Sequence, residues 1–575
     1  MTTVTTPAVP TGIKKFIPIL GWLPSYQASW LRFDLVAGLT AAAVVTPQAM
    51  AYATIAGLPV QVGLYVALVP MFVYTLLGTS RPLSVSSTSA LSILTGTALL
   101  AAVGPASDPT DYLVPAATLA FLVGVFLVLA ALFRLGILAN FISLPVLTGF
   151  KAGIGVVIFV SQLGKVLGLS IPSGSSVLET LATILTSLGQ INWPTVTLAA
   201  FTLAILILLP RFAQRIPAAL VAVASGIALS AMIDLGNLGI SLIGEIPTGL
   251  PSFSLPDLSL VNTLWLPAMG IALMSFTESI AAARAFRKHG DPEPDANQEL
   301  FALGMANVAG CLFQAYPAGG GTSQTAVNSK AGAKTQMAQL VTVAVVVVIL
   351  LFLAPLISLM PEATLGALVL VAAVELIDVA KFRDMAQIRR TELIWALLAF
   401  GGVIVLGVLQ GILVAILFSL LTLLVNVDHP PVYVLGREPG TDVFRPLADH
   451  PQDETFPGLL IVRTEGRLFF ANVSRVIDQL WSLIHQVSPE PQVVVLDCDA
   501  IPDIEYTALK SLMEFEEQLQ DAGILLWLAA LNPDALPLIR RAPLGKKLGN
   551  ERMYPDLEQA IESYSHRFDK RVSNG

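Results

Sequence analysis

The sequence predicts an all-α polytopic membrane domain followed by a small soluble α/β domain. Apolar residues make up 55% of the chain and charged residues only 13%, with a mean hydropathy of +0.75, whereas soluble domains contain about 25% charged residues. Apolar segments recur up to about residue 427, and short apolar runs alternate with amphipathic stretches after it. We therefore expect a cytoplasmic N-terminal segment (1–32), a transmembrane domain (33–427), a linker (428–456) and a soluble domain (457–575).

Fourteen apolar segments are predicted in the membrane domain, some of them shorter than a full span. They cover residues 33–57, 61–79, 87–103, 114–133, 146–168, 193–210, 217–235, 263–283, 298–314, 322–335, 336–357, 363–379, 391–408 and 412–427. Fourteen segments divide into two sets of seven, and seven is odd. The second half therefore inserts with inverted topology, as a 7+7 inverted repeat.

The positive charges support this segmentation, because Lys and Arg collect in cytoplasmic connections. With the N-terminus inside, the cytoplasmic connections contain Arg81, Arg134, Arg211, Arg215, Arg284, Arg287, Lys288, Lys330, Lys334, Lys381, Arg383, Arg389 and Arg390. The outward connections, including 169–192 and 236–262, contain neither Lys nor Arg. We expect a multi-pass membrane protein in contact with lipid, with both termini in the cytoplasm.

Two interrupted segments stand at corresponding places in the two halves. Pro317 and the glycines 319–321 end one helix, and Thr322 and Ser323 begin a short new one. Residues 81–97 repeat this pattern with Pro82 and a cluster of Ser and Thr. Irregular backbone at membrane depth must be buried in protein or line a wet cavity. Two half-helices entering from opposite faces would aim their N–H groups at the midplane, and this arrangement suits an anion.

Polar residues inside other apolar segments are further candidates. Glu278 is costly inside a helix unless it is paired or wetted, so it could bind and release a proton; alternatively it pairs with a Lys or reaches the inner vestibule. Gln48 and Tyr52 share one helical face and could line the cavity, although Tyr52 could also only pack between helices. Lys151 and Lys165 are interpreted as lysines that extend towards the membrane surface.

Several classes of function are disfavoured. The chain has no P-loop, no His-Glu-x-x-His and no nucleophile elbow, so we expect no catalytic residue. Its two cysteines, Cys311 and Cys498, form neither a disulfide framework nor a metal site, and we expect no metal or cofactor. A net charge of -8 without a basic arm argues against nucleic-acid binding.

The soluble domain shows alternating strand and helix patterns. Strands are expected at Leu459–Val462, Gln492–Leu496 and Ile524–Leu528, and an amphipathic helix at Ala508–Gln520. This alternation predicts a small α/β domain.

The chain resembles the SulP family of anion transporters, the sulfate permease relatives, over almost its whole length. The signature-like run is P-Q-A-M-A-Y-A-T-I-A-G-L-P with G-L-Y after it, within Pro47–Tyr65. The second half matches at 277–285, at N-Q-E-L (297–300) and at T-A-V-N-S-K-A-G-A-K-T (325–335). The tail resembles a STAS domain at L-F-F-A-N (468–472) and L-D-C-D-A-I-P-D-I-E-Y-T-A-L (496–509).

The resemblance implies a UraA-like membrane domain with core and gate parts, a homodimer, an elevator-type movement of the core, and a bacterial inner membrane location. It implies an anion between the N-termini of the third and tenth segments, at Ser86, Ser87, Thr88, Ser89, Thr322, Ser323, Gln324 and Thr325. The position of Glu278 is commonly acidic in proton- or sodium-coupled members. Thr507 occupies the position of a phosphorylatable residue in related regulators; a plain structural loop is the alternative.

This chain departs from the family pattern at two places. Gln324 stands where many relatives carry Arg, so a fixed positive charge is absent there, and Ser86 and Ser87 replace a common Gly-Pro. We expect secondary transport of a small inorganic anion, sulfate first, by proton symport through Glu278. The alternatives are a sodium-coupled bicarbonate or proton-coupled dicarboxylate transporter, a passive anion channel, and a membrane regulator acting through its STAS domain.

Overall fold

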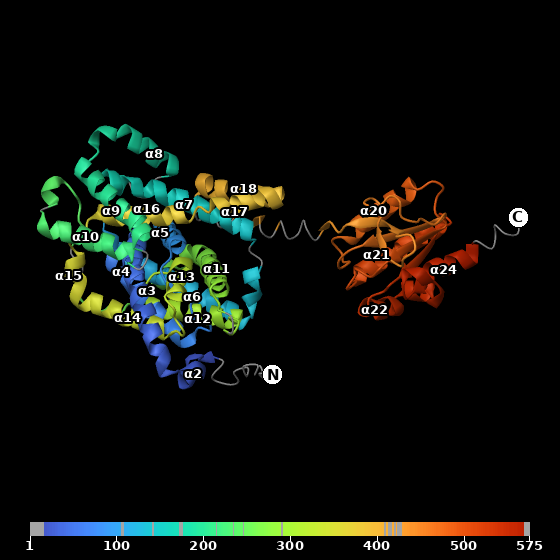
Figure 1. Cartoon of the computed structure of the whole chain (residues 1–575), viewed down its shortest axis with the longest axis horizontal. Helices are drawn as coiled ribbons and strands as arrows, with labels where there is room; N and C mark the ends of the chain where they lie inside the picture. The colour runs from blue at the N-terminus through green and yellow to red at the C-terminus, as the bar shows by residue number, and fades with distance from the viewer. Residues whose placement is uncertain are drawn as a thin grey trace. The chain divides into compact units, whose positions relative to one another are not determined.

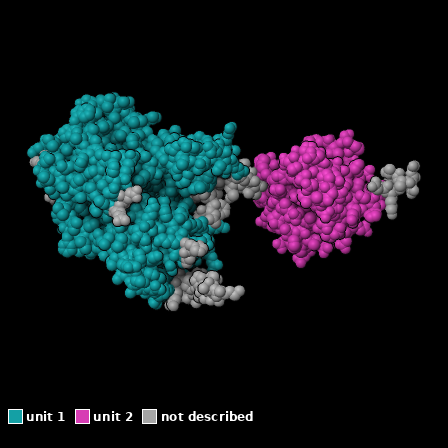
Figure 2. All heavy atoms as spheres, viewed as in Figure 1, with its two compact units in different colours: residues 1–420 teal, residues 421–575 magenta. Residues whose placement is uncertain are grey.

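The chain folds into two compact units, residues 1–420 and residues 421–575 (Figure 2). The computed structural model describes residues 16–568, apart from 105–107, 141–142, 172–175, 214–215, 234, 245–246, 289–290 and most of 408–427. Most of the predicted last segment (412–427) and residues 1–15 of the predicted N-terminal segment (1–32) therefore lie outside the described residues.

The first unit is helical, and its helices follow the predicted segments closely (Figure 1). They are α2 (Ile19–Trp22), α3 (Ala28–Ile55), α4 (Val60–Leu77), α5 (Ser89–Val103), α6 (Leu113–Leu132), α7 (Leu144–Leu167), α8 (Val177–Thr186), α9 (Trp193–Phe212), α10 (Ala218–Met232), α11 (Val261–Ala285), α12 (Ala296–Cys311), α13 (Thr322–Lys330), α14 (Met337–Val348), α15 (Ala354–Ile357), α16 (Glu362–Glu375), α17 (Val379–Ile388) and α18 (Arg390–Leu406). Within the described residues, eight helical stretches are long and apolar enough to cross a membrane. This is a membrane protein.

Three elements differ from the expectation. The first long helix, α3, begins at Ala28, inside the segment predicted to be polar and peripheral. Helix α8 occupies the connection between α7 and α9; it is amphipathic and starts with a capping box between Ser176 and Glu179. Helix α17 lies in the connection before α18. Peripheral amphipathic helices of this length escape a search for long apolar runs.

The helices of the first unit pack as two groups. In the core group, α6 packs on α11 and α12, and α3 packs on α4, α13 and α14. In the gate group, α7 packs on α16 and α18, and α9 packs on α10 and α16. Small residues permit the closest approaches: a Cβ on Gly149 of α7 would collide with the backbone of Ala396 on α18. Glycine at this position therefore lets α7 and α18 approach closely.

Two short strands join the interrupted segments. β1 (Val85–Ser86) precedes α5, β2 (Gly319–Gly320) precedes α13, and the two pair antiparallel with Val85 opposite Gly320 and Ser86 opposite Gly319. A Cβ on Gly319 would lie within 3 Å of both Leu91 and the Ser275 hydroxyl, at 2.8 and 2.9 Å. Glycine is therefore required where the two backbones meet between α5 and α11.

The second unit is a six-stranded sheet with helices on both faces (Figure 1). Its strands are β3 (Val432–Arg437), β4 (Phe444–Pro446), β5 (Leu459–Thr464), β6 (Val493–Asp497), β7 (Leu525–Ala529) and β8 (Met553–Tyr554), in the order β4-β3-β5-β6-β7-β8. Its helices are α20 (Val473–Gln486), α21 (Tyr506–Asp521), α22 (Ala535–Arg541), α23 (Pro543–Leu548) and α24 (Leu557–Phe568).

Side chains alternate across this sheet. Leu460 and Val462 of β5 pack with α20 and α21, whereas Leu459 and Ile461 pack with α24. The four strands β5 to β8 run parallel, as expected for a sheet covered on both faces. The predicted strands and helix of this domain are present.

The interval predicted as a linker (428–456) is partly folded. It contains β3 and β4, and β3 extends the sheet by pairing antiparallel with β5. Its Pro, Asp and Gly residues resemble a linker in composition, but Val432, Val434 and Leu435 supply apolar contacts to the two sides of the sheet.

Candidate functional site

The N-termini of the half-helices α5 and α13 meet inside the membrane unit. Thr88 caps α5, because its Oγ1 accepts a hydrogen bond from the N–H of Leu91 at 3.3 Å. Helix α13 starts after Gly321, which offers no capping side chain, and the N–H of Gly321 donates to the carbonyl of Ser84 at 3.1 Å. With β1 and β2 paired, both positive helix ends are held in one region.

Four of the predicted binding residues hold the tips together. The Ser86 hydroxyl donates to Oε1 of Gln324 at 2.6 Å, and Nε2 of Gln324 donates to the Ser87 carbonyl at 3.0 Å. The hydroxyl of Thr325 accepts a hydrogen bond from the N–H of Ser84 at 3.1 Å. These side chains are buried and hydrogen-bonded within the protein, so they hold the two tips in position.

The side chains of Thr322 and Ser323 are exposed, unlike those of Gln324 and Thr325 in the same helical turn. They lie on the first turn of α13, whose leading N–H groups have no intrahelical acceptor. A solute that reaches these hydroxyls also meets the uncapped, positive end of the helix. This face of the α13 tip is the open part of the candidate site.

Helix α3 brings two of the predicted residues towards α5. Tyr52 lies close to Ser89, the first residue of α5, and is buried. Gln48 lies one turn earlier on the same face, and its Oε1 is buried without a hydrogen-bond partner in the described part of the chain. An unpaired buried acceptor is costly, and a donor from water or a ligand would satisfy it.

Glu278 on α11 lies next to the α5 tip. Its Oε2 accepts from the Thr88 hydroxyl at 3.2 Å, and its Oε1 accepts from Nζ of Lys151 at 3.0 Å. The expectation that Lys151 extends to the membrane surface is therefore wrong: its ammonium turns inward to a carboxylate. Of the two interpretations of Glu278, pairing with a Lys describes the geometry, and pairing is compatible with proton binding.

Sequence reasoning missed the link between Lys151 and Glu278, although a usable signal was present. Both charges stand inside apolar segments, and buried charges of opposite sign are found paired. It also missed Tyr316, whose hydroxyl is hydrogen-bonded to Ser92 of α5 at 2.9 Å. Tyr316 directly precedes Pro317, at the start of the interrupted stretch.

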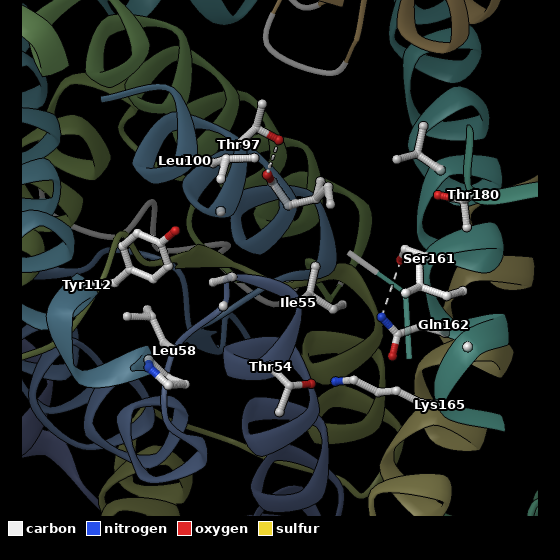
Figure 3. A pocket seen from close by; sticks show the side chains of 18 of the residues that line it. Thr54, Ile55, Leu58, Thr97, Leu100, Tyr112, Ser161, Gln162, Lys165 and Thr180 are labelled. Carbon is white, nitrogen blue, oxygen red and sulfur yellow. Dashed lines mark hydrogen bonds between the residues drawn. The ribbon is translucent and has the colours of Figure 1, made fainter. Parts of the chain in front are cut away.

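A separate cavity of about 950 Å³ lies between the two helix groups (Figure 3). It is lined by the end of α3 and one side of α5, and by α7, α16 and α18 from the gate group. Lys165 of α7 and Thr54 of α3 face each other across it (Figure 3). Its lining includes none of the ten predicted binding residues, so the cavity is distinct from the tips.

The predicted phosphorylation residue in the second unit is accessible. Thr507 is exposed in the first turn of α21, two residues after Glu505, which forms a 3.0 Å ion pair with Arg467. Accessibility alone does not assign the modification, so Thr507 stays a prediction.

Paired inverted half-helices within a two-group helical unit define the class of inverted-repeat membrane transporters. The chain belongs to the sulfate permease family, whose model matches residues 31–399. A STAS domain model matches residues 450–560.

Relatives agree with this assignment. A probable sulfate transporter of Mycobacterium tuberculosis is 38% identical over 555 residues, which cover 95% of this chain and 99% of that protein. The murine anion transporter Slc26a9 has a solved structure with a TM-score of 0.88 and 22% identity, covering 97% of this chain and 96% of that one. The transmembrane domain of a cyanobacterial bicarbonate transporter, BicA, gives a TM-score of 0.60 with 27% identity, covering 68% of this chain and 98% of that domain.

Proposed function

We propose that this protein is a secondary active transporter of a small inorganic anion, with sulfate as the first candidate. The observation that best supports this proposal is the open face of the α13 tip. There, Thr322 and Ser323 are exposed beside a helix N-terminus that no side chain caps. Hydroxyl and N–H donors with a positive dipole match the oxygens of an anion. The relatives named as sulfate transporters support sulfate over other anions.

We propose proton symport, with Glu278 as the proton-binding group. Its side chain is only 7% exposed. Its carboxylate accepts a hydrogen bond from the hydroxyl of Thr88, the residue that caps α5. A proton bound there is close enough to the anion site for each to affect the affinity of the other.

An elevator-type movement is the mechanism that we propose for carrying the site across the membrane. Both tips belong to elements that pack with the core group, whereas Lys151 comes from the gate group. The core group can therefore carry both tips together, while its contacts to the gate group change.

Counterflow in proteoliposomes tests these proposals. We expect labelled sulfate to accumulate against its gradient when a pH step is imposed, and the Glu278→Gln variant to lose this pH-driven accumulation. Flux that ignores the pH step would instead indicate a channel, and full pH-driven uptake by the variant would remove Glu278 from coupling. Competition with bicarbonate and with a dicarboxylate in the same assay decides between the candidate anions, and a sodium gradient tests the alternative coupling ion.

A further inference from the structure

The ion pair between Lys151 and Glu278 connects the two helix groups. Lys151 belongs to α7 of the gate group, and Glu278 belongs to α11 of the core group. Nζ of Lys151 lies 3.0 Å from one carboxylate oxygen, and the other oxygen accepts from Thr88, the cap of α5. A single carboxylate therefore separates the ammonium group from the tip of α5.

The tips themselves carry no positive side chain. Residues 84–97 and 319–329 contain neither Lys nor Arg. Gln324, the longest polar side chain at the α13 tip, is neutral. Its amide oxygen accepts from the Ser86 hydroxyl, and its amide nitrogen donates to the Ser87 carbonyl. Lys151 is the ammonium group that the structure pairs with Glu278, which in turn accepts from Thr88 at the α5 tip. Its side chain is 24% exposed and that of Glu278 only 7%.

Tyr52 on α3 lies near Glu278, and also near Tyr316 before β2 and Glu375 at the end of α16. The elements that pack against α11 or α7 carry further charges, among them Glu299 on α12, Lys330 at the far end of α13, Arg284 at the end of α11, and Arg390 and Glu392 in the first turn of α18. Helices α5 and α6 contribute no titratable side chain. Glu299 is engaged with the hydroxyls of Tyr74 and Thr79, at 2.7 and 2.5 Å. Lys151 is consequently the direct ionic partner of Glu278.

We propose that Lys151 is the cation that binds the transported anion, and that Glu278 competes with the anion for it. This inference rests on the proposed function. In the anion-free state, the carboxylate holds the ammonium. When a proton from the solution binds the carboxylate, the ion pair breaks, and the anion takes the place of the carboxylate beside the ammonium. Release reverses both steps: the anion leaves, the proton leaves, and the pair forms again.

This exchange couples the proton to the anion through the cost of an unpaired buried charge. If Glu278 is protonated and no anion is bound, the ammonium of Lys151 has no ionic partner. If an anion binds while Glu278 is unprotonated, the anion is repelled by the carboxylate. Both half-loaded states are therefore disfavoured. Because the pair also spans the core and gate groups, it holds them together until the carboxylate binds a proton.

Equilibrium binding of radiolabelled sulfate to the purified full chain, at mildly acidic and mildly alkaline pH, tests the exchange. The Lys151→Met variant should bind sulfate at least about tenfold more weakly at acidic pH, since it lacks a charge-assisted contact. Lys151→Arg should recover most of this affinity. Glu278→Gln should bind sulfate more tightly than wild type at alkaline pH, and with little dependence on pH, because the competitor is gone.

That last result separates the exchange from a purely structural pair, since a structural pair predicts weaker binding when either partner is removed. The double variant Lys151→Met/Glu278→Gln removes both charges, so it leaves no buried charge unpaired and should match Lys151→Met at acidic pH, where Glu278 no longer opposes the anion. Lys381→Met is the matched control: it removes an exposed Lys that pairs with Asp378 at 3.1 Å in the same unit, and binding should not change.

Wild-type affinity in Lys151→Met, or no gain in affinity in Glu278→Gln, would overturn the exchange while leaving transport intact. A wild-type protein that neither binds nor transports sulfate or bicarbonate would instead refute the proposed function itself.

Discussion

The hydroxyl of Ser86 donates a 2.6 Å hydrogen bond to Oε1 of Gln324, so side chains as well as the β1–β2 pairing join the two half-helices. The other end of the Gln324 amide holds the Ser87 carbonyl. We therefore expect the Gln324→Leu variant to leave two buried polar groups unpaired and to lose about 1–3 kcal/mol of stability. Thermal unfolding of the detergent-solubilised protein measures this loss. Ser323→Ala, which removes an exposed hydroxyl from the same helical turn, should unfold like wild type.

Bulk at the open face of α13 should block transport without unfolding the protein. Ser323 is exposed, so a Ser323→Trp side chain displaces water rather than core atoms. We expect sulfate uptake to fall to background while the thermal unfolding temperature stays within a few degrees of wild type. Ala228→Trp adds the same bulk at an exposed position on α10 and should transport normally. Unchanged uptake by Ser323→Trp would move the site elsewhere.

The contact between α7 and α18 should tolerate no added atoms. A Cβ on Gly149 would collide with the backbone of Ala396, so Gly149→Ala must push the helices apart, at a cost of about 1–3 kcal/mol. Gly401 on α18 is the matched control, because nothing lies within 4 Å of an added Cβ there. We expect the unfolding temperature to fall for Gly149→Ala and to stay at the wild-type value for Gly401→Ala. Equal unfolding temperatures for the two variants would contradict this packing.

The thiol in the second unit should be unreactive while the domain is folded. Burial, and to a lesser extent the neighbouring Asp497, raise the pKa of Cys498 well above its ordinary value. Less thiolate is then present at mildly alkaline pH, and alkylation requires the thiolate. In a Cys311→Ala background, we expect maleimide to label Cys498 only after denaturation. Rapid labelling of the native protein would show that this side of the sheet opens.

Regular periodicity accounts for the parts of the fold that could be predicted. Long apolar runs such as that of α6 show their membrane helix directly, and β-branched runs such as that of β6 show their buried strand. The strands β3 and β4 were not predicted because Pro, Gly and Asp residues surround them. Their pairing, with each other and with β5, also leaves no pattern in the local sequence.

The roles of the site residues divide in the same way. Ser and Thr clusters after a helix break identify the two tips, because capping and helix-breaking are local properties of the chain. Which of these side chains is exposed does not follow from local sequence. Thr322 and Ser323 are exposed, whereas Gln324 and Thr325, the next two residues of the helix, are buried and hydrogen-bonded to Ser86 and Ser84.

The sequence by itself determined that this chain is a membrane protein of two inverted halves with a soluble α/β domain, since hydropathy, charge placement and helix breaks are written in consecutive residues. Only the tertiary structure decided that Lys151 meets Glu278, 127 positions away in the chain, and that the pair lies between the two helix groups. Partners in a buried ion pair are chosen by helix packing, and packing depends on the whole unit.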